Sequence, residues 1–187
     1  MLIDITLRIS PKMVTGAQGN EKKTLTGHLG THFDCMNREF PLEYTERKAL
    51  VFDVSNISGG EIGPEDIDFE LIEPDMFVAF YTGFIEQEGY GTKKYFSEHP
   101  QLSMELIEKL LERKISIIGI DFAGVRRGPE HTPTDQHCAD RNVFIVENLC
   151  SLKAVLGNDS KKAFTANTYP MNYAEMTGLP CRVIAKI

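Results

Sequence analysis

Residues 103–120 have the sequence Ser-Met-Glu-Leu-Ile-Glu-Lys-Leu-Leu-Glu-Arg-Lys-Ile-Ser-Ile-Ile-Gly-Ile, and this stretch decides the fold class. Its first part predicts a helix over residues 103–114, because a serine can cap the start and apolar residues recur at i and i+4. Arg113 and Lys114 close the last turn, where the helix dipole favours cations. Residues 115–120 are apolar almost throughout, which is typical of a strand covered on both faces. The stretch therefore predicts a helix followed by a central strand.

Other short stretches rich in β-branched and aromatic residues also predict strands. The predicted strands cover residues 2–7, 50–54, 76–82, 143–147 and 182–187. The central strand extends over residues 115–121. A second, shorter helix is expected over residues 148–156, ended by Gly157, while residues 15–30 and 124–135 are expected to be loop. These elements predict an α/β or α+β fold with few helices and one mixed sheet.

The composition is that of one soluble globular domain over residues 1–187. Hydrophobic residues make up 42% of the chain and charged residues 25%, and the formal charge of −7 disfavours nucleic acid and anionic membranes as partners. No leader segment is visible, and no apolar run approaches the ~20 residues that span a bilayer. Four scattered cysteines indicate reduced thiols. We therefore expect a cytoplasmic protein with no nucleic acid or membrane partner.

The clearest chemical motif is His-x-x-x-His-x-Asp, formed by His28, His32 and Asp34. Imidazole and carboxylate are usual ligands of zinc and similar ions, so these side chains are a credible three-ligand set. On a straight strand the two histidines would lie ~13 Å apart, which is too far for one ion. A metal site therefore needs a bend, and Gly30 can supply it. Two solvated loop histidines, with Asp34 in a turn, are the alternative that the spacing leaves open.

Glu147 is the next candidate, because it ends an apolar strand just before a predicted helix, where α/β sheets present functional groups. A buried carboxylate is costly unless a cation or several hydrogen-bond donors meet it. Glu147 is therefore either a ligand or an acid that accepts bonds from backbone N–H groups at a helix start. His137 and Asp135 can turn towards the same point, although an exposed loop is equally compatible. His99 and His131 are expected to be surface residues.

Beyond these motifs, the sequence resembles the cyclase family of metal-dependent hydrolases, which includes the bacterial kynurenine formamidases. The family signature is His-x-Gly-Thr-His-x-Asp-x-Pro-x-His, and residues 28–34 match its first seven positions. Weaker similarities follow in the same order along nearly the whole chain, at residues 3–6, 60–62, 81–84, 119–121, 145–149 and 178–185. Many weak matches in the right order are more specific than any one of them.

The resemblance implies an α/β fold of the swivelling β/α/β type, a homodimer or homotetramer, and a site with one or two divalent ions, Zn²⁺ or Mn²⁺. His28, His32 and Asp34 would be ligands from one loop, with Asp34 able to bridge two ions. Glu147 would be a ligand from a distant strand. His137 would be a further ligand and would share the catalytic role with Glu147.

Two departures from the family pattern affect this expectation. Arg38 stands where the family has the histidine usually taken as proton shuttle. A guanidinium stays protonated and has no acceptor, so Arg38 cannot be a general base. The family's other site histidine falls where Asp135 stands here. Either a two-residue deletion keeps His137 in use, or Asp135 substitutes as an oxygen ligand.

The resulting hypothesis is a metal-dependent hydrolase of a C–N amide, formamide or cyclic ester or amide bond in a small molecule, similar to an arylformamidase of tryptophan catabolism. The ion would lower the pKa of a bound water to ~7 and so supply hydroxide as the nucleophile. Arg38 and Phe84 are assigned to substrate binding, since arginine can bind a carboxylate bidentately. One alternative is a binding protein on the same fold that has lost catalysis, for which Arg38 is the argument. Another is a purely structural protein, which predicts no stoichiometric metal.

Overall fold

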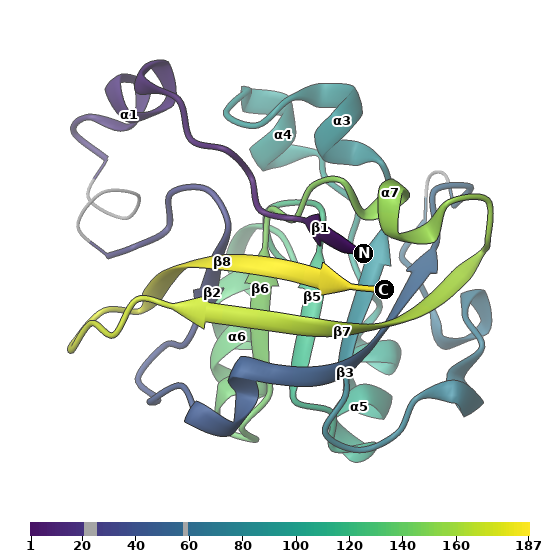
Figure 1. The fold of residues 1–187 in the computed structure, drawn as a ribbon. Helices are drawn as coiled ribbons and strands as arrows, with labels where there is room; N and C mark the ends of the chain where they lie inside the picture. The colour runs from purple at the N-terminus through teal and green to yellow at the C-terminus, as the bar shows by residue number, and fades with distance from the viewer. Residues whose placement is uncertain (21–25, 58–59) are drawn as a thin grey trace.

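The computed structural model of the protein describes residues 1–20, 26–57 and 60–187 and contains one mixed β-sheet (Figure 1). Within these residues, eight strands lie in the order β1-β8-β2-β6-β5-β4-β3-β7, and β7 also pairs with β8, which closes the sheet. Neighbours among β3, β4, β5 and β6 are parallel, and the other pairs are antiparallel. The strands are β1 (Leu2–Asp4), β2 (His32–Asp34), β3 (Glu46–Asp53), β4 (Phe77–Tyr81), β5 (Ile117–Ile120), β6 (Phe144–Glu147), β7 (Lys161–Pro170) and β8 (Gly178–Lys186).

The predicted unit of a helix followed by a central strand is confirmed. Helix α5, Met104–Glu112, begins after Ser103, whose hydroxyl accepts a bond from the Leu106 amide at 3.1 Å. The next strand is β5, and all four of its residues are buried. The remaining helices are short: α1 (Pro11–Ala17), α3 (Phe84–Glu88), α4 (Lys93–Ser97), α6 (His131–Ala139) and α7 (Leu152–Leu156), with 3₁₀ turns at Leu42–Thr45, Pro64–Asp66, Phe69–Leu71 and Gly128–Glu130.

The core lies on both sides of the sheet, because its central strands are buried on both faces. On β4, Val78 and Phe80 pack in a cluster that includes the apolar face of α5. Phe77 and Ala79 alternate with them and belong to a second cluster, which also holds residues of β2, β6 and β8. This double burial explains why the central strands have continuous apolar sequences.

The expectation of a mixed α/β fold with few helices and one mixed sheet is confirmed, and the sheet is in addition closed into a barrel-like form. Every predicted strand overlaps an observed one, whereas β2 and β7 are not predicted. Strand β2 has only three residues, and β7 contains two lysines, two threonines and an asparagine. Helix α7 begins later than expected, because Asn148 and Ser151 have φ of +59° and +56°.

Two segments expected to be loop contain helices. Helix α6 begins within residues 124–135, although its sequence, HTPTDQHCA, is poor in strong helix formers. Pro133 is tolerated because it lies in the first turn, where its missing N–H costs no helical hydrogen bond. Helix α1 overlaps residues 15–30, of which residues 21–25 lie outside the described part of the chain.

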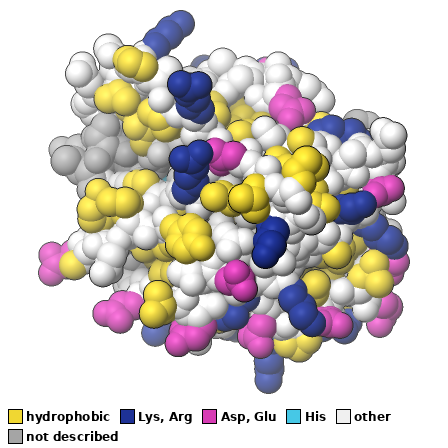
Figure 2. All heavy atoms as spheres, viewed as in Figure 1, with side chains coloured by type: hydrophobic (Ala, Val, Ile, Leu, Met, Phe, Trp, Pro, Cys, Tyr) yellow, Lys and Arg dark blue, Asp and Glu magenta, His cyan; other side chains and the backbone are white. Residues whose placement is uncertain are grey.

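Figure 2 shows one face of the molecule, on which apolar, basic and acidic side chains are mixed. None of the five histidines of the chain is visible on this face. In the described ranges, every helix is too short or too polar to cross a membrane.

Candidate metal centre

Strands β2 and β6 place three of the predicted side chains together. In their antiparallel register His32 lies opposite Glu147, and Asp34 follows two residues after His32. Opposite residues of such a pair share a face, and side chains alternate along a strand, so the three side chains point to the same side. All three are buried. The strand register therefore assembles the half of the site that lies within the sheet.

The loop before β2 bends at glycines and returns His28 to the same place. Gly27 and Gly30 have φ of +83° and +75°, in the left-handed region that glycine adopts readily. His28 Nε2 lies 3.1 Å from Asp34 Oδ1, and the ring centroids of His28 and His32 are 4.9 Å apart. The bend that a metal site requires at Gly30 is therefore present, and the three residues of the motif lie close enough to share an ion.

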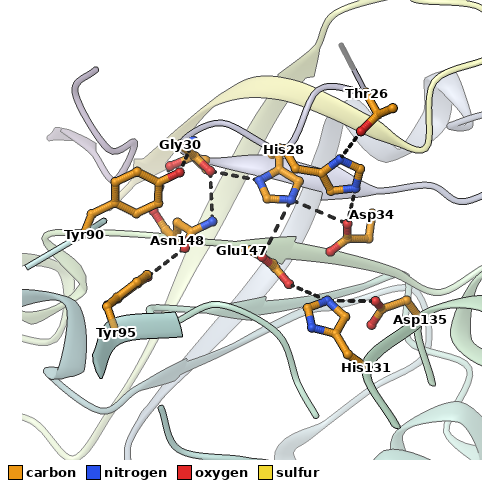
Figure 3. A network of polar contacts seen from close by, with 12 residues as sticks. Thr26, His28, Gly30, Asp34, Tyr90, Tyr95, His131, Asp135, Glu147 and Asn148 are labelled. Atoms are coloured by element: carbon orange, nitrogen blue, oxygen red, sulfur yellow. Dashed lines mark hydrogen bonds and ion pairs between the residues drawn. The ribbon is translucent and has the colours of Figure 1, made fainter. Parts of the chain in front are cut away.

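Helix α6 adds His131 and Asp135, which are one helical turn apart and share a face. His131 Nε2 is 3.1 Å from Asp135 Oδ2 and 3.4 Å from Glu147 Oε1. Glu147 also reaches His32, since its Oε2 lies 3.6 Å from His32 Nε2, and Figure 3 shows Glu147 beside His131. The expectation that His131 is a surface residue is wrong, because its side chain is only 34% exposed and contacts two buried acids. Its i,i+4 spacing to Asp135 places the two side chains together only because the segment is helical, which its sequence does not predict.

These side chains line a pocket of about 530 Å³, a size suited to a small molecule. The rest of its wall combines apolar and small polar residues, including Thr26, Met36, Phe96, Ala123, Gly128, Thr132 and Thr177. The pocket lining thus combines imidazoles and carboxylates with apolar residues.

The site brings titratable side chains of both kinds into close contact. Three carboxylates, Asp34, Asp135 and Glu147, are buried beside three imidazoles. Burial lowers the pKa of His32, but the charges of Asp34 and Glu147 outweigh this and raise it to about 9. Burial raises the pKa of Asp135 to about 7, and burial together with the Asp34 charge raises the pKa of Glu147. These pKa increases mean that Asp135 and Glu147 bind protons more readily when no metal cation balances their charge.

The donor atoms fit a divalent cation. Four buried site atoms have no hydrogen-bond partner among the described residues: His32 Nε2, Asp34 Oδ2, Asp135 Oδ1 and Glu147 Oε1. Buried polar atoms in a folded protein are almost always satisfied, so four such atoms around one pocket fit a bound cation or ordered water. Nitrogen and carboxylate oxygen are the atoms that zinc and manganese accept. Two groups of side chains are close enough to hold an ion, because the ligand atoms within each group lie within 4.8 Å of one another. The first group is His28, His32 and Asp34, and the second is Asp34, His131 and Asp135.

The structure does not bring His137 to this cluster. It lies on α6 with its Nε2 2.7 Å from Glu108 Oε1 of α5, and its side chain is 33% exposed. Asp135 and His137 are two residues apart, about 200° around the helix, so they face nearly opposite directions. Of the two alternatives for the family's second histidine, the geometry therefore favours Asp135, accompanied by His131.

Arg38 and Phe84, expected to bind substrate, also lie outside the pocket wall. Arg38 donates to Asp140 Oδ1 through Nη2 at 2.5 Å and Nε at 3.2 Å, and both side chains are about half exposed. Phe84 is half-buried and stacks on Tyr95, with ring centroids 5.8 Å apart. The aromatic residue that does line the pocket is Phe96.

His99 is buried, which corrects its expected place on the surface. Its ring stacks on Phe122 with centroids 5.6 Å apart, and Nδ1 lies 2.8 Å from the Pro100 carbonyl oxygen. Burial lowers the pKa of His99 to about 4. His99 is therefore a neutral core histidine, not a member of the metal cluster.

Comparisons with known proteins match the chain to one protein family. The family model described as "Putative cyclase" matches residues 3–126, a range that contains His28, His32 and Asp34. None of the curated proteins compared with the chain matches it.

Solved structures show the same fold along the whole chain. A protein described as a "potential metal-dependent hydrolase with cyclase activity" is 23% identical, with 99% of this chain and 96% of that chain covered at a TM-score of 0.77. A predicted metal-dependent hydrolase from Bacillus stearothermophilus is 20% identical, with 99% and 97% covered at 0.74. Isatin hydrolase A from Labrenzia aggregata is 18% identical, with 99% and 93% covered at 0.73.

Proposed function

Because the chain belongs to the cyclase family, we propose that it is a metal-dependent hydrolase of a C–N amide, formamide or cyclic ester or amide bond in a small molecule. The observation that carries the proposal is the convergence of three imidazoles and three carboxylates, with four unsatisfied buried atoms, on one pocket. The similar solved structures are named as hydrolases, which supports the same reaction class.

We propose that one or two ions, Zn²⁺ or Mn²⁺, bind here. His28, His32 and Asp34 would hold the first, and Asp34 with His131 and Asp135 the second, so Asp34 would belong to both groups. Glu147 reaches both groups, because its two oxygens lie 3.6 Å from His32 Nε2 and 3.4 Å from His131 Nε2. A divalent ion supplies an activated water and polarises the substrate carbonyl.

The chain's own residues complete the site. Glu147 Oε1 borders the pocket and can receive a proton from the attacking water and pass it to the leaving group. His131 Nε2 would share this role if only the first ion is bound, because its lone pair then holds no metal. Met36, Phe96 and Ala123 provide the apolar wall that orients a small substrate and limits access of water. These roles replace the catalytic role expected of His137.

The substrate remains the finer part of the proposal. Kynurenine formamidase activity, in tryptophan catabolism, and hydrolysis of a cyclic amide are both compatible with the reaction class. A second candidate is a metal- or small-molecule-binding protein without catalysis, which is favoured by one observation: Arg38 replaces the family's histidine and is held by Asp140. A homodimer or homotetramer in the cytoplasm, without nucleic acid or membrane partners, and the swivelling form of the fold also stay predictions.

The test is elemental analysis of the protein purified without chelator, followed by assays on formamides, lactones and cyclic imides. We expect one or two equivalents of metal and turnover of at least one class. Asp34→Asn should lose the metal, whereas the matched change Asp140→Asn, at an exposed acid outside the pocket, should keep it. Absence of stoichiometric metal in the wild type would refute the metal site. Bound metal without turnover of any substrate would select the binding protein.

A further inference from the structure

A buried hydrogen-bond network stands behind His32. The Gly30 carbonyl oxygen accepts two bonds of 2.9 Å, one from His32 Nδ1 and one from Asn148 Nδ2 (Figure 3). The Gly30 amide donates to the Tyr90 hydroxyl at 2.9 Å. The peptide groups on both sides of Gly30 are therefore held by side chains from distant parts of the sequence.

Asn148 and Tyr95 form the second layer of this network. The Tyr95 hydroxyl donates to Asn148 Oδ1 at 2.7 Å, and the two residues are 0% and 1% exposed. Asn148 directly follows Glu147, and its carbonyl accepts a bond from the Thr31 hydroxyl at 2.8 Å. Asn148 thus connects the end of β6, which carries one site acid, to the bent loop that carries the histidines.

The network determines which nitrogen of His32 faces the site. A carbonyl oxygen only accepts, so Nδ1 of His32 must carry a proton to bond the Gly30 oxygen. In a neutral imidazole the lone pair is then on Nε2, which lies 3.5 Å from Asp34 Oδ1 and 3.6 Å from Glu147 Oε2. The Gly30 carbonyl accordingly sets both the tautomer and the direction of the ring.

The Asn148 side chain is held in turn by Tyr95. Its amide must present NH₂ to the Gly30 oxygen, because the reversed amide would place two acceptors against each other, and the Tyr95 hydroxyl donates to Oδ1 at the other end. A buried network of this kind favours one geometry. The sequence gives no signal for it, because residues 30, 95 and 148 are brought together only by the fold.

We propose that Tyr95 and Asn148 are positioning residues that hold His32 in the tautomer and orientation required for metal binding. The inference rests on the proposed function, because it assigns these residues to the same metal site. Partners behind a ligating histidine typically change metal affinity by roughly 10–100-fold when removed. Neither residue needs to contact the ion for this effect.

The experiment uses Tyr95→Phe, which keeps the ring, and Asn148→Gly, which keeps a backbone able to adopt φ of +59°. Tyr81→Phe is the matched control, since Tyr81 is also buried and donates to Glu86 at 3.0 Å, away from the pocket wall. Zinc affinity is measured by competition with a chromophoric chelator. In the ion-free proteins, ¹⁵N NMR follows the Nδ1–H signal of His32, and urea titration reports stability.

We expect roughly tenfold weaker zinc binding in Tyr95→Phe and up to roughly 100-fold in Asn148→Gly, with unchanged affinity in Tyr81→Phe. The protected Nδ1–H signal of His32 should exchange faster in the first two variants only. Affinities within twofold of the wild type with the signal retained would overturn the proposal, as would an equal loss in the control. If the wild type binds no zinc but the NMR signal still depends on Tyr95 and Asn148, the proposed function fails while the positioning network stands.

Discussion

Replacing each of the two histidines of α6 by glutamine tests whether His131, and not His137, belongs to the metal site. His131 contacts two buried acids in the pocket, so His131→Gln removes either a ligand or a proton carrier. Loss of a positioned acid or base typically costs at least ~10²-fold in kcat/KM, which is about 2.7 kcal/mol, and we also expect at least ~10-fold weaker zinc binding. His137 pairs with Glu108 near the surface, where ion pairs contribute about 0–1 kcal/mol. His137→Gln should therefore keep activity within about twofold.

The assay compares zinc affinity, turnover of whichever amide or lactone the wild type hydrolyses, and urea stability for both variants. Both substitutions remove one imidazole from the same helix, so each controls for the other. If His137→Gln lost metal and activity while His131→Gln kept them, the placement of α6 and the assignment of the site would both be refuted.

Three other predictions concern the glycine bend, the buried histidine and the arginine. Gly27→Ala should be less stable in urea than Gly19→Ala, although both have positive φ that costs ~1–2 kcal/mol, because only at position 27 would a Cβ collide with a backbone carbonyl; equal midpoints would contradict this. The pKa of His99 is about 4 in the folded protein and ~6.5 when unfolded, so the unfolded chain binds protons first as pH falls. The contribution of His99 to the free energy of unfolding is therefore complete above pH ~6.5 and is lost between pH ~6.5 and ~4, with ~2 kcal/mol lost by pH 5. In His99→Phe, the decrease in the free energy of unfolding between pH 7.5 and 5 should be smaller by that amount. Arg38→His should change kcat/KM by less than about threefold, since Arg38 lies outside the pocket wall; a clear gain of formamidase activity would instead support the binding-protein alternative.

Local sequence was sufficient for the elements whose signal is contained within a few neighbouring residues. The capped amphipathic helix before β5 and the continuous apolar strands could be predicted, because capping and burial periodicity act over one or two turns. The motif at His28, His32 and Asp34 also showed that a bend was needed and that Gly30 was the residue able to provide it. The pairing of His32 with Glu147 could only be expected from the family resemblance, since register is a property of two strands together.

The tertiary structure decided the rest of the site. The segment from residue 131 has weak helix formers, so its sequence does not define a helix face, and a residue's direction is unknown until the face is known. Folded as α6, it turns His131 and Asp135 into the pocket and His137 towards α5, because each residue advances the helix by about 100°. The network through Tyr95 and Asn148 depends on contacts between residues more than fifty positions apart. Sequence spacing therefore determined which chemistry this protein can carry, and packing of distant segments determined which side chains carry it.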